Sequence, residues 1–228
     1  MRPGSMMGRV AAIVWKDLLI EVRTKASFNS MLAFAGLVLF VFSFAIGPDT
    51  PLLRRIAAGL LWVAIVFTGL LSLNRTYQSE EGAGGLEGLR LAPGDPRAIY
   101  LGKLAGNVLL LLALELVLFP AAAVLFQIEL AAHALPLAGI AILGTLGISI
   151  AGTFYAALTL HLRAREIMLP LLLIPALVPP LLGAVNATQL VLDGNPFAEA
   201  TLWVRLLIAY DVVFFVVCTW LFPLAVEE

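Results

Sequence analysis

Six apolar stretches, each about 20 residues long, dominate this chain of 228 residues. A stretch of that length, coiled as a helix, crosses the hydrocarbon core of a bilayer. Charged residues make up only 13% of the sequence, against about 25% in an ordinary soluble domain. The pattern predicts an all-α integral membrane protein with six transmembrane helices. The expected spans are residues 27–46, 56–73, 104–126, 135–160, 167–185 and 206–226.

Lysine and arginine are unevenly distributed between the two sides of these spans. If the N-terminus lies inside, eleven of the fourteen cationic residues fall in inner segments and only Arg54, Arg55 and Arg205 in outer ones. Loops on the cytoplasmic side of a membrane carry such an excess of positive charge. The sequence therefore predicts that both termini and the loop 74–103 are cytoplasmic.

Residues 1–26 precede the first span and have the pattern of an amphipathic helix. The apolar face consists of Ala11, Val14, Trp15, Leu18, Leu19 and Val22, and a basic stripe consists of Arg9, Lys16 and Arg23. A helix of this kind lies in the plane of the membrane interface, with Trp15 at the depth of the headgroups. The alternative is a cytosolic helix that packs on the rest of the protein.

The segment Glu80–Pro96 is polar and rich in glycine, although it lies between two apolar runs. Leucines flanked by charges on a short helix are suited to binding in the groove of a protein, and the alternative is a flexible solvated loop. At its end, Asp95-Pro96 has the pattern of a helix cap followed by a first-turn proline, which predicts a helix leading into the third span. The candidate docking residues are Glu81, Gly85, Leu86, Glu87, Leu89, Arg90, Leu91 and Pro93.

Several kinds of chemistry lack the residues that they require. No segment matches G-x-x-x-x-G-K-[ST], so the chain is not expected to bind and hydrolyse ATP by itself. His133 and His161 are predicted at opposite membrane faces and Cys218 is the single cysteine, so no metal site is expected. No nucleophile, base and orienting group come together in the pattern. We therefore predict a non-enzymatic chain with no catalytic residue and no bound cofactor.

Two carboxylates, Glu115 and Asp211, fall inside predicted spans. An ionisable group at membrane depth faces the bundle interior, where it belongs to a substrate or proton path or forms structural hydrogen bonds. For the structural interpretation, the expected partners are Asn107, Thr153, Tyr155 or a backbone carbonyl. Asp211 follows Arg205 by six residues, which suggests a position toward the outer surface.

Arg54 and Arg55 are the strongest cations of the predicted outer face, and Trp62 follows them on the second span. These three residues are candidates for contact with a substrate that carries a carboxylate. The alternative is that the arginines anchor the span at the membrane interface.

Small residues and prolines mark the fourth and fifth spans. Small side chains spaced along a helix allow neighbouring helices to approach closely, and each proline removes a backbone donor, so that the helix must kink or unwind. The small residues are Gly144, Gly147, Ala151 and Gly152, and the prolines are Pro170, Pro175, Pro179 and Pro180.

Four segments resemble the CcmB family, the membrane subunit of the ABC-type system for cytochrome c maturation. The loop Gly85–Pro93 is the most specific of them, and the proline-rich run from Leu169 to Pro180 is also similar. The other two are Trp15-Lys16-Asp17-Leu18 with Glu21 and Arg23, and the pair Phe44–Pro48 and Ile56–Ala64.

The resemblance implies an ABC-2-like transmembrane domain over residues 27–228 in the bacterial inner membrane. It makes residues 1–26 the interfacial elbow helix and residues 74–103 the coupling loop for a partner ATPase. It further implies heme as the cargo, together with a heme-handling membrane subunit, a small single-span subunit and a heme chaperone. A membrane subunit of an exporter for a drug, lipid or polysaccharide is the alternative.

Overall fold

The computed structural model describes residues 6–47, 49–77, 95–130, 133–160, 165–194 and 200–227. Within these ranges the chain is helical and has no strand. Six of the helices are long and apolar enough to cross a membrane, as the sequence predicts. The helices are α1 (Met6–Thr24), α2 (Ala26–Ile46), α3 (Thr50–Arg75), α6 (Arg97–Phe126), α7 (Ala134–Leu158), α8 (Arg165–Leu192) and α9 (Ala200–Glu227).

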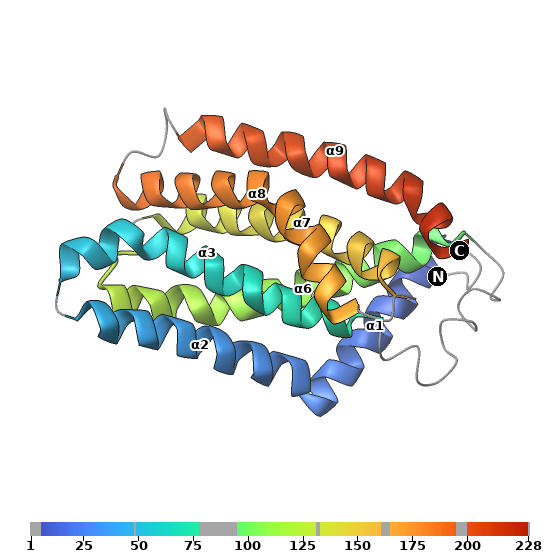
Figure 1. Cartoon of the computed structure of the whole chain (residues 1–228), viewed down its shortest axis with the longest axis horizontal. Coiled ribbons are helices and arrows are strands. Elements are labelled where there is room, and N and C mark those ends of the chain that lie inside the picture. Colours follow the sequence, from blue (N-terminus) through green and yellow to red (C-terminus); the bar gives the residue numbers. More distant parts are fainter. Residues whose placement is uncertain are drawn as a thin grey trace.

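The six long helices lie alongside one another, and α1 crosses one end of the bundle at an angle (Figure 1). The C-terminal end of α9 lies at this same end. The start of α3 and the C-terminal ends of α6 and α8 lie at the opposite end. The two termini of the described chain are therefore on one side, as an even number of spans requires.

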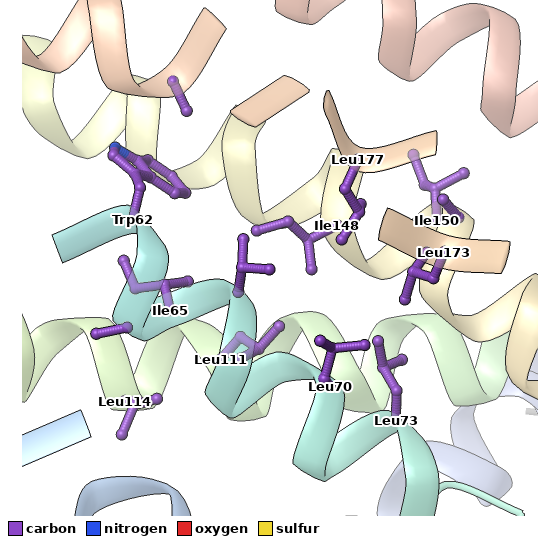
Figure 2. Close-up of a cluster of buried hydrophobic side chains, with 14 of the residues drawn as sticks. Trp62, Ile65, Leu70, Leu73, Leu111, Leu114, Ile148, Ile150, Leu173 and Leu177 are labelled. Carbon is purple, nitrogen blue, oxygen red and sulfur yellow. The ribbon is translucent and has the colours of Figure 1, made fainter. Parts of the chain in front are cut away.

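Helices α3 and α7 form the centre of the bundle. In α3, 67% of the most apolar stretch is buried and in α7 56%, whereas in α2 the share is 17%. Figure 2 shows Trp62, Ile65 and Leu70 of α3 in one cluster of buried side chains with Leu111 of α6 and Ile148 of α7. The outward face of α2 is apolar and exposed, which is the expected state of a helix that borders lipid.

Capping residues explain where two helices begin. The carboxylate of Asp49 accepts the backbone N–H of Leu52 at 3.1 Å, so α3 begins at Thr50, earlier than the predicted span, and its first turns include Arg54 and Arg55. Likewise, the carboxylate of Asp95 accepts the N–H of Arg97 at 2.9 Å. The predicted helix start at Asp95-Pro96 is thus confirmed, and α6 runs unbroken into the third span.

The small residues of α7 are packing sites, as predicted. A Cβ atom on Gly144 would lie 2.2 Å from Cη2 of Trp62, and one on Gly152 would lie 2.2 Å from Cδ1 of Leu73. Both side chains belong to α3, so the absence of two Cβ atoms allows α3 and α7 to come into direct contact.

Helix α8 continues from Arg165 to Leu192 through all four of its prolines. It changes direction along its length (Figure 1), so the predicted kink is confirmed, whereas the described helix is not unwound. Pro180 has no N–H for the carbonyl of Ala176, one turn earlier. The hydroxyl of Tyr210 on α9 donates to that carbonyl at 2.9 Å and replaces the missing bond.

Candidate functional site

A row of buried polar side chains joins α3, α6 and α7 inside the bundle. We call it the polar seam, and apart from Thr76 its members are all buried. Polar groups at membrane depth require partners within the protein, because lipid offers none. The seam consists of Thr76 at the C-terminal cap of α3, Asn107 and Glu115 on α6, and Thr145, Ser149 and Thr153 on α7.

Three hydrogen bonds connect the seam. The amide of Asn107 accepts from the hydroxyl of Thr76 at 3.1 Å and donates to the hydroxyl of Thr153 at 2.9 Å, so that one side chain links three helices. The hydroxyl of Thr145 donates to Oε1 of Glu115 at 2.5 Å. Glu115 is therefore held by Thr145, whereas Asn107 and Thr153, two of its expected partners, bond to each other.

The two bonds between α6 and α7 share one antiparallel register. Glu115 lies eight residues after Asn107 on α6 (115 − 107), and its partner Thr145 lies eight residues before Thr153 on α7 (153 − 145). That register places Ser149 opposite the apolar Leu111. Accordingly, Oγ of Ser149 and the second oxygen of Glu115 are buried without a hydrogen-bond partner in the described structure.

The bond from Thr145 gives a direct test of whether Glu115 is structural. We expect Thr145→Val, which keeps the shape but removes the donor, to lower the free energy of unfolding by about 1–2 kcal/mol. Thr145→Ser and Glu115→Gln keep a donor and an acceptor respectively and are expected to stay within about 0.5 kcal/mol of the parent. Unfolding in mixed micelles with added SDS measures the difference. Equal losses for Val and Ser at position 145 would contradict the assignment.

A buried ion pair fixes α1 to α6 at the end of the seam. Nζ of Lys103 lies 2.9 Å from Oδ2 of Asp17, and the lysine side chain is only 2% exposed. The ring of Tyr77 lies beneath the same ammonium group, at 5.9 Å. One turn earlier on α1, Ile13 packs so closely on Gly102 that a Cβ there would lie 2.8 Å away.

These contacts decide how the apolar face of α1 is used. Ile13 is the buried residue of α1, and it packs against α6. Trp15 is 71% exposed and Val22 67%, and Leu19 is exposed as well. The helix therefore packs on the protein along one side and leaves a second apolar side exposed, and its position in the membrane interface stays a prediction.

Asp211 lies deep in the bundle, not toward the outer surface as its distance from Arg205 suggested. A Cβ on Gly147 would lie 2.9 Å from Oδ1 of Asp211, so the carboxylate lies directly on the middle of α7. Both of its oxygens are buried, and neither has a hydrogen-bond partner among the described residues. The position of Asp211, midway along α9, explains the correction.

The two outer arginines, Arg54 and Arg55, line one hollow of about 460 Å³, whereas Trp62 is not part of it. Nε of Arg54 donates to the carbonyl of Gln127 at 3.0 Å, and Gln189 donates to the carbonyl of Arg54 at 3.3 Å. Arg54 thereby connects the ends of α3, α6 and α8, beside a hollow of about 320 Å³. Trp62 lies two turns further along α3, fully buried, and donates to Thr188 at 2.9 Å.

The predicted docking residues, Glu81 and Gly85 through Pro93, lie outside the described residues, as does His161. The structure adds Asp17, Lys103 and Thr145, which sequence reasoning did not single out as site residues. A signal for the last two exists, because polar residues recur every four positions in the apolar runs of α6 and α7. Lys103 and Asn107 follow this spacing on α6, and Thr145, Ser149 and Thr153 follow it on α7.

The fold and the polar seam define a helical multi-pass membrane protein whose interior contains linked polar groups. The chain belongs to the CcmB protein family, whose model matches residues 8–228. It is 36% identical over 184 residues to a heme exporter protein B from Rhodobacter capsulatus, covering 80% of this chain and 84% of that protein. It is 36% identical over 180 residues to the protein of the same name from Haemophilus influenzae, covering 78% and 80%.

A third relative is similar over a comparable length. The heme exporter protein B of Pseudomonas aeruginosa is 32% identical over 188 residues, which is 82% of this chain and 83% of that protein. The matched region therefore includes most of the bundle in each of these three relatives.

Proposed function

We propose that this chain is a membrane-spanning subunit of a heme exporter that serves the biogenesis of c-type cytochromes. The observation that carries the proposal is the family match over residues 8–228, together with relatives named heme exporter protein B. Six helices of membrane-spanning length support a location in the bacterial inner membrane.

The energy for export comes, in this proposal, from ATP hydrolysis by a partner ATPase. The sequence has no phosphate-binding loop of its own, which supports a division of labour between two chains. The cationic excess supports a cytoplasmic position for the termini and for the loop 74–103. The loop docks on the ATPase. A heme-handling subunit, a small single-span subunit and a heme chaperone complete the proposed system.

The described contacts indicate how a movement of the loop 74–103 would reach the centre of the bundle. Helix α6 begins at the end of the loop, where Asp95 caps its first turn. Ile13 on Gly102 and the pair Asp17–Lys103 hold α1 against this first part of α6. Asn107 then connects α6 to α3 and α7. A displacement of the loop would therefore move α1 and α6 together and reach the bundle centre through the polar seam.

Deletion of the gene and complementation test the proposed function. The deletion strain is expected to lose mature c-type cytochromes, measured by heme staining of membrane fractions, and the parent gene is expected to restore them. Normal cytochrome levels in the deletion strain would contradict heme export and favour an exporter of a drug, lipid or polysaccharide.

Docking of the loop is tested by a triple variant, Leu86→Ala, Glu87→Lys and Leu89→Ala. Interface anchors of this type each contribute on the order of 1–2 kcal/mol, so we expect copurification with the ATPase to fall at least tenfold. Glu129→Lys makes the same charge reversal at the opposite end of the bundle and is expected to leave copurification unchanged. Survival of the complex with all three loop substitutions would show that the loop is not the docking surface.

A further inference from the structure

A hollow with a charged lining lies beneath α1, where α1 meets α2, α3 and α6. We call it the elbow pocket, and its volume is about 360 Å³. It is lined by four charged side chains, Asp17, Glu21, Arg75 and Lys103, and by the hydroxyl residues Ser27 and Ser72, among others. Neither the polar seam nor the arginines at the opposite end of the bundle explains why charged side chains line a hollow here.

Three of the four charged groups are already bound. Lys103 and Asp17 form the buried ion pair at 2.9 Å. Oε1 of Glu21 accepts the backbone N–H of Phe28 at 2.7 Å and so caps the first turn of α2. Arg75 is exposed to the pocket and forms no ion pair with any described residue. The pocket therefore offers a guanidinium group that has no ion-pair partner among the described residues, and such a group is suited to binding two oxygens of a phosphate.

The charges of the other groups in the pocket restrict the class of ligand further. Two carboxylates and two cations give the pocket no net charge, and Asp17 is compensated by Lys103, so a purely anionic ligand would lie beside Glu21, a carboxylate with no cationic partner among the described residues. A zwitterion with a phosphate and an ammonium group matches both signs. A primary ammonium donates three hydrogen bonds, and a trimethylammonium group donates none. Carboxylate acceptors beside the phosphate position therefore favour ethanolamine over choline.

The position of the pocket indicates a lipid as the source of that headgroup. Ile20 of α1 lines the pocket and is 45% exposed, next to the uncovered apolar side that includes Trp15 and Leu19. An amphipathic helix with such a side lies at the boundary of headgroups and acyl chains. Leu18 and Leu110 add apolar lining for the glycerol and first methylene groups. The mouth of the pocket is thus at the depth where phospholipid headgroups lie.

We propose that the elbow pocket binds the headgroup of a phosphatidylethanolamine molecule. Arg75 binds the phosphodiester with help from the hydroxyls of Ser27 and Ser72, and the ammonium group lies toward the carboxylate of Glu21. A bound lipid would then fill the space between α1 and α3, where the protein itself leaves a hollow. This inference does not depend on heme as the cargo.

Native mass spectrometry of the full-length chain in detergent tests the proposal by titration with single lipids. We expect phosphatidylethanolamine to bind about tenfold more tightly than phosphatidylcholine or phosphatidylglycerol of the same acyl chains. Arg75→Gln is expected to remove this preference, and Arg75→Lys to keep part of it. Arg23→Gln removes an equal charge from α1 outside the pocket and is the matched control.

Three outcomes would overturn the proposal. The first is equal binding of the three lipids, and the second is an equal effect of Arg75→Gln and Arg23→Gln. The third is displacement of phosphatidylethanolamine by an equimolar amount of soluble O-phosphoethanolamine, which would point to a free phosphate ester as the ligand. Ser72→Ala gives a second variant, expected to weaken lipid binding about threefold without loss of fold, and unchanged binding by this variant also counts against the site.

Discussion

An Asp17→Ala variant is expected to lose about 3 kcal/mol of stability, because it leaves the ammonium group of Lys103 buried without its carboxylate partner. Lys103 is 2% exposed, and the Asp17 carboxylate lies 2.9 Å from it. Truncation of one member of a buried ion pair costs about 3–5 kcal/mol, and the lower end applies because the Asp17 side chain is 23% exposed. Unfolding by SDS in mixed micelles is the measurement.

Two further variants, Lys103→Met and the double variant with Asp17→Ala, test whether the loss comes from the ion pair itself. We expect Lys103→Met to be milder than Asp17→Ala, because Asp17 keeps access to water and the contact of Lys16 at 3.1 Å. The double variant, Asp17→Ala with Lys103→Met, should be more stable than Asp17→Ala alone. Lys16→Met, on the exposed side of the same carboxylate, should cost less than about 1 kcal/mol. Additive losses in the double variant would show that the two groups are not coupled.

A Gly144→Ala variant is the second substitution with a large expected effect, although it adds only one methyl group. The new Cβ would lie 2.2 Å from Cη2 and 2.6 Å from Cζ3 of Trp62. The indole cannot swing away cheaply, because it is fully buried and its Nε1 donates to Thr188 at 2.9 Å. We expect a loss of about 2–3 kcal/mol, the upper range for overpacking in a core.

The chain offers matched controls for this effect on the same helix. A Cβ added to Gly139 would have no atom within 4 Å, so Gly139→Ala should be neutral or stabilise by up to about 1 kcal/mol. The three atoms nearest to a Cβ on Gly152 all belong to Leu73, whose branched side chain adjusts more easily than an indole, so the cost of Gly152→Ala should lie between the two. Trp62→Phe should partly rescue Gly144→Ala, because the shorter ring removes the clash. Equal thermal stability of the Gly139 and Gly144 variants would contradict this packing of α7 on α3.

Much of the architecture could be predicted from the sequence, because long apolar runs in a sequence are enough to locate membrane-spanning helices. The runs of apolar residues identified all six spans, and the pattern Asp95-Pro96 located the start of α6. The start of α3 was missed for a physical reason. Arg54 and Arg55 look like loop residues, but at the end of a span their charged groups can lie outside the apolar layer while the backbone is helical.

The contacts between helices could not be predicted as well from the sequence, because hydropathy does not determine which helix faces pack against each other. The sequence indicated that Glu115 turns inward but offered several partners, and only packing of α6 on α7 selected Thr145. In the same way, the sequence suggested Trp62 as a substrate contact near Arg54 and Arg55, but packing against Gly144 buries it inside the bundle. The closure of α1 over α6 depends on Asp17 and Lys103, two residues far apart in sequence.

That separation has a consequence for biosynthesis. Lys103 is made 86 residues after Asp17 (103 − 17), which at the usual rates of translation is a delay of roughly 4–17 s. During this interval α1 already exists and α6 does not, so Asp17 has no Lys103 with which to pair. When α6 enters the bilayer, its lysine finds a carboxylate already at the place where it will be buried. Helix α1 therefore cannot reach its final position until α6 has been made.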